Sequence, residues 1–378
     1  MGARPDVIVV GAGIVGCACA RALAREGLEV LVVDASFPGG GTTAAGMGHI
    51  VVMDDSPAEL ALSAYSRGLW AELADELPRS VEDRRPGTLW LAAGADEMPI
   101  LGQKRDLYQR AGVHAEVLDA TALRDAEPNL RLGLAGGLVV PDDRVLYPPN
   151  AARWMLDEAR RCGAVAWRDT RVVGVAERRV MLARAGGVQA LDTGAVVIAA
   201  GIDAPTLIPE LPIVPRKGHL AITDRAPGMC RHQLVELGYL HSAHALTGES
   251  TAFNLQPRAT GQVLIGSSRQ LVGRDASITP RVVGEMLRRA VEFMPPLASL
   301  SVLRIWTGFR PATPDSLPLI GPWPEIPGVW IAAGHEGLGI TTATGTAELI
   351  VAGITGTTPP IDAAPFAPSR TMAAPLTA

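Results

Sequence analysis

The sequence predicts an α/β protein in which a domain built on a parallel sheet is interrupted by an α+β domain with a mixed, largely antiparallel sheet. Three observations lead to this prediction. Residues 6–34 have the pattern of a strand, a glycine turn, a helix, a second strand and an acid. Apolar runs that end in glycine return at 195–201 and 328–334, as buried parallel strands do. Between these runs, residues 214–269 contain stretches that alternate apolar and polar residues, which is typical of antiparallel strands.

The first unit has the spacing of a dinucleotide site. The turn Gly11-Ala-Gly13-Ile-Val-Gly16 follows an apolar strand and opens a helix. Gly11 permits the tight turn, Gly13 lets a pyrophosphate approach the backbone, and Gly16 lets the helix pack on the strand. Asp34 ends the next strand, 18 residues after Gly16, where a carboxylate can accept hydrogen bonds from a ribose diol. An Asp at this place disfavours NADP. FAD and NAD both remain open, and a glycine-rich turn in an ordinary βαβ unit is the alternative.

Residues 39–49 follow this unit and are mostly glycine, alanine and threonine. Such small side chains cannot fill a core, but they let the backbone run close to a flat ligand. We predict a segment that passes along the cofactor, with Thr42 and Thr43 near phosphate or ribose and Met47 to His49 near its reactive end. A flexible loop is the alternative for the segment, and a structural histidine is the alternative for His49.

The composition narrows the classes of partner. The 378 residues carry a net charge of −5 without a basic block, which argues against nucleic acid. The four cysteines have no metal-ligand spacing, so no metal site is expected, and Cys17 and Cys19 are expected to pack inside the first helix. The N-terminus leads straight into a predicted strand, so no signal peptide is expected, and no apolar run reaches the ~18 residues of a transmembrane segment. We expect the cytoplasm, and we leave open both peripheral attachment to the inner face of the membrane and the oligomeric state.

Three segments together are similar to a known family. They are residues 9–16 with Asp34, residues 42–48, and, most specifically, the stretch from Trp306 to Gly321 followed by residues 334–342. These segments resemble the FAD-dependent D-amino-acid oxidase family, which includes glycine oxidase, sarcosine oxidase and D-amino-acid dehydrogenase. The resemblance extends to about Arg370, and within the family the chain looks similar to bacterial D-hydroxyproline and proline dehydrogenase subunits.

The resemblance implies a division of the chain into two domains. A Rossmann-like FAD-binding domain would be formed by residues 1–82, 143–212 and 318–370. A substrate-binding domain would be formed by residues 83–142 and 213–317, and 371–378 would be a tail. Family members with covalent flavin use a cysteine in the C-terminal region, and no cysteine follows Cys230. The FAD is therefore expected to be non-covalent.

The resemblance also implies an enzyme. It would oxidise the CH–N bond of glycine, sarcosine, a D-amino acid, proline or hydroxyproline by hydride transfer to flavin N5, giving an imine. In the family the arginine that matches Arg310 binds the substrate carboxylate, and a guanidinium suits a bidentate grip. An internal ion pair with a residue such as Asp315 is the alternative. The remaining candidates are His49 and Tyr239 as catalytic and substrate-binding residues, and Gln256 and His335 as substrate-binding residues.

The cofactor is expected to touch the glycine turn, the small-residue segment and a helix start at Gly337 to Thr341. The N–H groups and dipole of that helix would stabilise the negative charge that builds on the reduced flavin, and an ordinary glycine entry to a helix is the alternative. The expected cofactor residues are Gly11, Gly13, Ile14, Val15, Gly16, Asp34, Ala35, Thr42, Thr43, Ala45, Gly46, Met47, Gly48, Val172, Val173, Ala200, Gly201, Arg310, Gly337, Leu338, Gly339, Ile340 and Thr341.

Two other functions compete with this one. A subunit that holds flavin as a relay inside a larger dehydrogenase would have no need for Arg310 as a carboxylate site. An NAD-dependent dehydrogenase is disfavoured because residues 39–49 and the helix start at Gly337 would have no role. The electron acceptor stays open between oxygen, a partner subunit and a quinone.

Overall fold

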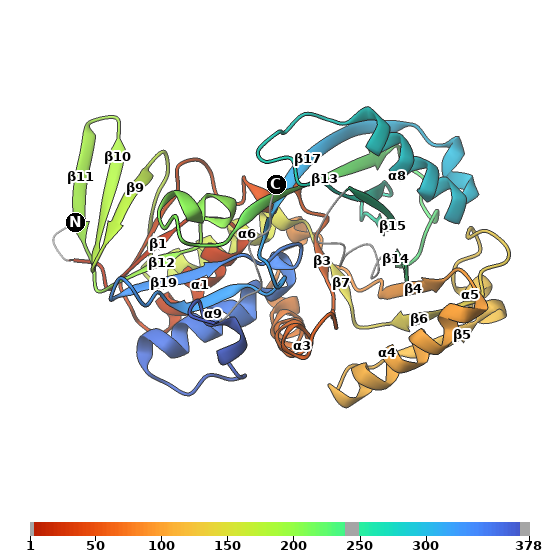
Figure 1. The fold of residues 1–378 in the computed structure, drawn as a ribbon, viewed down its shortest axis with the longest axis horizontal. Coiled ribbons are helices and arrows are strands. Elements are labelled where there is room, and N and C mark those ends of the chain that lie inside the picture. The colour runs from red at the N-terminus through yellow and green to blue at the C-terminus, as the bar shows by residue number, and fades with distance from the viewer. Residues whose placement is uncertain (1–3, 239–248, 371–378) are drawn as a thin grey trace.

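Two sheets lie side by side along the long axis of the molecule, a six-stranded sheet to the left and an eight-stranded sheet to the right in Figure 1. The computed structural model describes residues 4–238 and 249–370. One sheet is predominantly parallel and the other is largely antiparallel. The α/β architecture predicted from the sequence is therefore confirmed, while the exact domain boundaries stay a prediction.

The six-stranded sheet has the order β18-β19-β12-β1-β2-β8. Its strands pair in parallel except for the edge strand β18, which is antiparallel to β19. The central strands β1 and β2 are continuous runs of Val, Ile and Leu, and all their residues are buried, as expected where both faces of a parallel sheet are covered. The strands are β1 (Val7–Val10), β2 (Val30–Val33), β8 (Val165–Trp167), β12 (Ala195–Ile198), β18 (Leu319–Pro322) and β19 (Val329–Ala333).

Helices cover one face of this sheet. Helix α1 packs between α6 and α9, and α3 packs against α9. These helices are α1 (Ile14–Arg25), α3 (Pro57–Leu73), α6 (Pro148–Arg161) and α9 (Gly339–Thr355). Within the described ranges, none of the helices is both long enough and apolar enough to cross a membrane.

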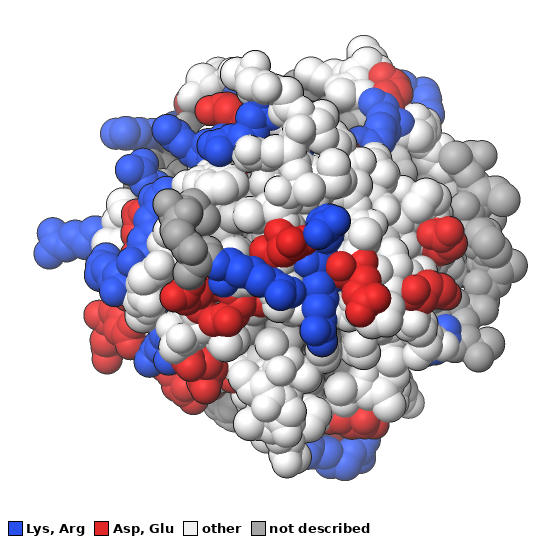
Figure 2. Space-filling model, turned by 90° about the vertical axis from the view of Figure 1, so that its left-hand side faces the viewer, with Lys and Arg blue, Asp and Glu red and all other residues white. Residues whose placement is uncertain are grey.

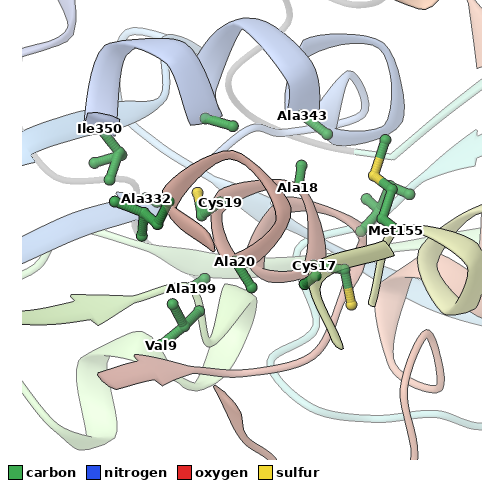
Figure 3. Close-up of a cluster of buried hydrophobic side chains, with 14 of the residues drawn as sticks. Val9, Cys17, Ala18, Cys19, Ala20, Met155, Ala199, Ala332, Ala343 and Ile350 are labelled. Atoms are coloured by element: carbon green, nitrogen blue, oxygen red, sulfur yellow. The ribbon is translucent and has the colours of Figure 1, made fainter. Parts of the chain in front are cut away.

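Small side chains let α1 lie close to its neighbours. Figure 3 shows Cys17, Ala18, Cys19 and Ala20 of α1 with β-strand residues below and residues of α9 above. Cys17 and Cys19 are both 0% exposed, so the prediction that they pack inside the helix layer is confirmed. A Cβ on Gly16 would lie 2.0 Å from the carbonyl oxygen of Gly11, so only glycine fits at this crossing of helix and turn.

A three-stranded antiparallel sheet packs on the other face of the parallel sheet. Its buried residues Val172, Val180 and Leu182 join the core formed by β1, β2 and β12. Basic and acidic side chains are interspersed on this end of the molecule (Figure 2), so no single sign of charge covers the face shown. The strands are β9 (Arg171–Ala176), β10 (Arg179–Arg184) and β11 (Gly187–Asp192).

The eight-stranded sheet has the order β17-β13-β16-β15-β14-β4-β6-β5. Helix α8 (Pro280–Phe293) covers β15 and β16, and Phe293 stacks on Phe253 with ring centroids 4.8 Å apart. Helices α4 (Met98–Arg110) and α5 (Ala120–Ala126) lie beside β5 and β6. The strands are β4 (Thr88–Ala92), β5 (Glu116–Asp119), β6 (Gly136–Val140), β13 (Val214–Thr223), β14 (Gln233–Glu236), β15 (Ser250–Pro257), β16 (Val263–Arg269) and β17 (Val302–Ala312).

Two short elements join the sheets. The strands β3 (His49–Ile50) and β7 (Arg144–Val145) form an antiparallel pair. The helix α2 (Thr42–Ala45) packs on β17, and a Cβ on Gly308 would lie only 2.4 Å from the Cβ of Ala45. The small residues predicted to follow a cofactor therefore also let two distant parts of the chain touch.

Candidate active site

A cavity of about 670 Å³ lies between the two sheets. On one side it is lined by the residues at the carboxyl ends of β1, β2, β12 and β19. On the other side it is lined by one face of the eight-stranded sheet. Ligands of open α/β sheets bind outside the carboxyl ends of the parallel strands, so the cavity stands where the topology places a ligand.

The glycine turn forms one end of the cavity. Gly11 has φ of +104°, a conformation that a side chain disfavours. A Cβ on Gly13 would have one neighbour within 4 Å among the described residues, Thr43 Oγ1 at 3.4 Å. The N-cap residue Gly13 makes no side-chain hydrogen bond, and the positive end of the α1 dipole lies at this end of the cavity, where it suits a pyrophosphate.

Asp34 lies beside this turn at the end of β2. Its Oδ2 accepts a hydrogen bond from Ala12 N at 2.6 Å, and its Oδ1 accepts one from Ser36 N at 2.7 Å. These two backbone donors hold the carboxylate in place at the cavity wall. The orientation suits the ribose contact expected from the sequence.

Of residues 39–49, all but Gly39 and Ala44 line the cavity. The two threonines make protein contacts there: Thr43 Oγ1 accepts from Ile14 N at 3.0 Å, and Thr42 Oγ1 donates to Phe309 O at 2.7 Å. The first contact ties α2 to the glycine turn, and the second ties it to β17. The segment therefore sets the width of the cavity between the two sheets.

Arg310 lines the opposite end of the cavity from β17. Its Nη1 donates to Ser268 O at 3.0 Å. A Cβ on Gly218 would lie 2.4 Å from that Nη1, and a Cβ on Gly337 would lie 3.4 Å from Arg310 Nε. Two glycines thus leave room for the guanidinium next to the start of α9.

The alternative ion pair of Arg310 with Asp315 is not formed. Asp315 instead accepts two hydrogen bonds from Arg370, Nε to Oδ2 at 2.8 Å and Nη2 to Oδ1 at 2.9 Å. The Arg370 guanidinium lowers the pKa of this carboxyl group although burial raises it. Asp315 is therefore committed to fastening the C-terminal segment.

Charged residues that the sequence analysis missed surround Arg310. Arg216 is directly opposite Arg310 across the β13–β17 pair, is 3% exposed and pairs with Glu336 at 3.1 Å. Arg269 also lines the cavity. Three guanidinium groups therefore line the cavity, and Glu336 pairs with that of Arg216. No local motif marks Arg216 or Glu336, because only strand pairing brings them beside Arg310.

Both predicted histidines line the cavity and both are neutral. Burial, with a contribution from Arg258, lowers the pKa of His49 to about 3, and burial lowers the pKa of His335 to about 3. His335 Nε2 is 2.9 Å from Thr346 Oγ1, so this ring makes a structural contact with a side chain of α9. His49 Nε2 is buried without a hydrogen-bond partner in the described chain.

Several predicted residues do not line the cavity. Gly16 lies beneath the glycine turn, and Val173 is 48% exposed on β9. The hydroxyl of Thr341 donates to His49 O and accepts from Val51 N, so it joins β3 to α9. Gln256 is buried beside Arg258, 3.5 Å from its Nη1. Tyr239 lies outside the described residues.

The other predicted residues do line the cavity. They are Gly11, Gly13, Ile14, Val15, Asp34, Ala35, Thr42, Thr43, Ala45, Gly46, Met47, Gly48, His49, Val172, Ala200, Gly201, Arg310, His335, Gly337, Leu338, Gly339 and Ile340.

Comparison with known proteins identifies the family of this chain and its cofactor. The family model for FAD dependent oxidoreductases matches residues 6–352. The chain belongs to this family. It is 29% identical to a glycine oxidase of Pseudomonas aeruginosa over 96% of this chain and 98% of that protein. It is 27% identical to the hydrogen cyanide synthase subunit HcnC of the same organism over 97% of this chain and 96% of that protein.

A solved structure agrees with this assignment. Glycine oxidase from Geobacillus kaustophilus matches this FAD-dependent oxidoreductase with a TM-score of 0.87 and 25% identity, covering 98% of this chain and all of that one (100%). The family resemblance predicted from the sequence is confirmed. The fold class and the dependence on FAD are confirmed with it.

The residues present fit FAD. The uncapped N-terminus of α1 and the open space over Gly13 suit the pyrophosphate, Asp34 suits the adenosine ribose, and the uncapped start of α9 suits the flavin. Gly41 adds to this space, since a Cβ there would have no neighbour within 4 Å in the described ranges. Of the residues that the structure describes, no cysteine lines the cavity.

Proposed function

We propose that this FAD-dependent oxidoreductase oxidises the CH–N bond of a small amino or imino acid to an imine. The substrate class is glycine, sarcosine, a D-amino acid, proline or hydroxyproline. The observation that carries the proposal is the guanidinium of Arg310, which lines the cavity next to the start of α9. A guanidinium fork matches a carboxylate in a bidentate geometry, and every member of this substrate class has a carboxylate.

The charge around Arg310 supports an anionic substrate group. Arg216 and Arg269 line the same cavity, and Arg216 pairs with Glu336. The uncapped N-terminus of α9 adds a positive dipole end. The similarity to glycine oxidases supports the same class of substrate.

The apolar wall of the cavity suits a small aliphatic substrate. Met47, Val51, Trp90 and Leu220 line it, and they remove water from the place where the substrate carbon would lie. Low local polarity strengthens the attraction between Arg310 and a carboxylate.

Positioning is the main task of this chain in the reaction. Bound FAD supplies the two-electron acceptor. Arg310 fixes the carboxylate, and a fixed carboxylate restricts where the neighbouring carbon and nitrogen lie, which lowers the entropic part of the barrier. The donors at the start of α9 stabilise negative charge beside them.

The test is anaerobic reduction of the holoenzyme. Glycine, sarcosine, D-amino acids, and D- and L-proline and hydroxyproline are added one at a time while the flavin absorbance is followed. We expect one of them to bleach the flavin band. Arg310→Met should lower the second-order rate constant of bleaching by roughly two to three orders of magnitude, because truncating one partner of a hydrogen-bonded charge pair costs about 2–5 kcal/mol.

Arg304→Met is the matched control. Arg304 is exposed on the same strand and lies over the ring of Trp306, so its loss should leave the rate constant unchanged. If the wild-type flavin is present and no amine bleaches it, the substrate site is absent and the relay function is favoured. Admission of air after bleaching then distinguishes oxygen from another electron acceptor.

A further inference from the structure

A buried carboxyl group, Asp143, lies behind the cavity in the turn between β6 and β7. It is 0% exposed. Its backbone oxygen accepts a hydrogen bond from Gly87 N at 3.1 Å, which places it beside the start of β4. Nothing in the positioning of FAD or of a substrate carboxylate uses this group.

The side chain of Asp143 is surrounded by polar atoms without partners. Neither of its oxygens has a partner within ordinary hydrogen-bond geometry among the described residues, although Thr88, Arg67 and the Val52 backbone are close enough to favour the charged carboxylate. Arg67 Nη1 of α3 forms an ion pair with Oδ1 at 3.6 Å, and this buried nitrogen likewise has no hydrogen-bond partner among the described residues. Oε1 of Gln233 is a further buried atom without a hydrogen-bond partner among the described residues. The amide nitrogen of that side chain donates to Arg144 O at 3.1 Å.

Such an arrangement indicates enclosed water. Buried polar groups are nearly always hydrogen-bonded, and polar contacts longer than about 3.5 Å are commonly bridged by a water molecule. The carboxylate of Asp143 and the guanidinium of Arg67 offer two of the two to four partners that a buried water needs.

Thr88 of β4 connects this enclosed site to the cavity. It lines the cavity and is 1% exposed. Its Oγ1 accepts from Gln233 Nε2 at 3.3 Å, and its hydroxyl stabilises the Asp143 carboxylate. A hydroxyl both donates and accepts hydrogen bonds, so it can take up a proton on one side and release one on the other.

We propose that Asp143, reached through the Thr88 hydroxyl and enclosed water, accepts the proton that the substrate ammonium group loses before its CH–N bond is oxidised. This inference rests on the proposed function. An amino acid at neutral pH carries an ammonium nitrogen without a lone pair, and the lone pair is needed to form the C=N bond of the imine.

The proton transfer balances without a further reactant. The N–H bond of the ammonium group breaks and an O–H bond forms on Thr88. The proton originally on Thr88 passes through the water to an oxygen of Asp143. The products are a neutral amine and a carboxylic acid, and no electrons change hands in this step.

The electrostatics around Asp143 suit a proton acceptor near neutral pH. Burial raises its pKa to about 7 against the lowering contributions of Thr88, Arg67 and the Val52 backbone, and a group with such a pKa both takes up and releases a proton readily. Tyr108 of α4, whose hydroxyl donates to Val52 O, also lies within electrostatic reach of Asp143. The next residue in the chain, Arg144, pairs with Asp83, and β7, which begins there, pairs with the strand that carries the neutral His49.

Glu59 is the other carboxyl group with a raised pKa at this cavity. Burial and the neighbouring Asp55 raise its pKa to about 8. Its Oε2 accepts from Asp55 N, and Ser56 Oγ accepts from Glu59 N, both at 3.1 Å. These two bonds hold the chain at the start of α3, so Glu59 has a structural role there.

The pH dependence of anaerobic flavin reduction tests the proposal. In the wild-type holoenzyme the rate constant should rise with pH through an apparent pKa near 7. Asp143→Asn should abolish this step and lower the rate constant by roughly 10²- to 10⁴-fold. Thr88→Ser keeps the hydroxyl and should keep the step, whereas Thr88→Val should lose it.

A second readout does not depend on turnover. Infrared difference spectra of the resting holoenzyme, recorded below and above the expected pKa, should show the carbonyl band of a protonated carboxyl group in the wild type. Asp143→Asn should lose the component of that band that belongs to Asp143, while the component of Glu59, whose pKa is raised to about 8, remains. Asp142→Asn is the control, because Asp142 is the exposed neighbour, 43% accessible and paired with Arg85, and it should retain both the band and the kinetic step.

Three outcomes would overturn the proposal. One is an Asp143→Asn enzyme with lower stability and an unchanged pH profile, which would make the group a structural partner of Arg67. Another is a kinetic step that disappears in Glu59→Gln and persists in Asp143→Asn. If Asp143→Asn does not fold, equal profiles for Thr88→Ser and Thr88→Val would reject the route. A wild-type flavin that no amine bleaches would reject the proposed function itself, which is a different result.

Discussion

The two sheets contribute to the cavity in different ways. The six-stranded sheet contributes mainly backbone: the glycine turn, the uncapped end of α1 and small residues along α2. The eight-stranded sheet contributes side chains: Arg310, Arg216, Trp90 and Asn254. Backbone features depend on neighbours within a few residues. Side-chain placement depends on strands that are far apart in the sequence.

Strand register explains how the eight-stranded sheet brings its side chains to the cavity. Arg216 pairs with Arg310, and Gly218 pairs with Gly308, across β13 and β17. Trp90 pairs with Val235, and Val235 pairs with Asn254, across β4, β14 and β15. Paired residues present their side chains on the same face of a sheet. A shift of one residue in any of these pairs would turn the side chain away from the cavity.

The largest effect, a loss of FAD, is expected from a change in the backbone that the six-stranded sheet contributes to the cavity. Gly16→Ala would place a Cβ 2.0 Å from the Gly11 carbonyl oxygen, so the turn must distort and FAD should be lost. The flavin absorbance of the purified protein measures this. Gly68→Ala in α3, where a Cβ has no neighbour within 4 Å among the described residues, should retain FAD and gain roughly 0.5–1 kcal/mol of stability. Normal flavin content in Gly16→Ala would break the comparison.

A smaller effect, on substrate binding alone, is expected from a change in the eight-stranded sheet, which contributes side chains to the cavity. Gly218→Ala would place a Cβ 2.4 Å from Arg310 Nη1 and displace the guanidinium. Flavin content should stay normal while the KM of the amino acid rises roughly 10- to 100-fold, because small misplacements of a positioning group are costly. Gly284→Ala in α8, with open space around its Cβ, should leave the KM unchanged. Loss of flavin from Gly218→Ala would show that the contributions of the two sheets to cofactor and substrate binding cannot be separated.

The smallest effect is a change of stability with pH. Burial lowers the pKa of His335 to about 3, below the ordinary value near 6.5. The unfolded chain therefore binds a proton first as the pH falls, so the contribution of this residue is present above about 6.5 and declines toward about 3. His335→Leu should flatten the acid side of the curve of unfolding free energy against pH, measured by urea denaturation. An unchanged slope would mean that the ring is hydrated in solution.

Local motifs made much of the cofactor side predictable. The glycine turn, Asp34 and the helix after Gly337 were read from spacing within short segments, and they line the cavity as a group. The prediction was less successful for isolated residues. Val173 follows the cavity residue Val172, yet strand alternation turns it outward to 48% exposure. Gln256 and Thr341 are buried in contacts with other elements.

The substrate side was predictable only where a family motif contained the residue. Arg310 was found through the segment from Trp306 to Gly321. Arg216, Asn254 and Trp90 carry no motif, and β5, β6 and β11 were not predicted because their short runs contain glycine or charged residues. Asp143 was visible only as part of a turn, because burial and missing partners are properties of the packed protein.

The sequence by itself determined the backbone cradle, because glycine, strand, helix and acid at fixed spacing leave one compatible local geometry. It also determined the family and, with it, FAD. Only the tertiary structure decided which charges surround Arg310, which histidines are neutral, and which carboxyl group is enclosed behind Thr88. These properties depend on distances and burial between residues that are up to hundreds of positions apart, and strand register and packing set those distances.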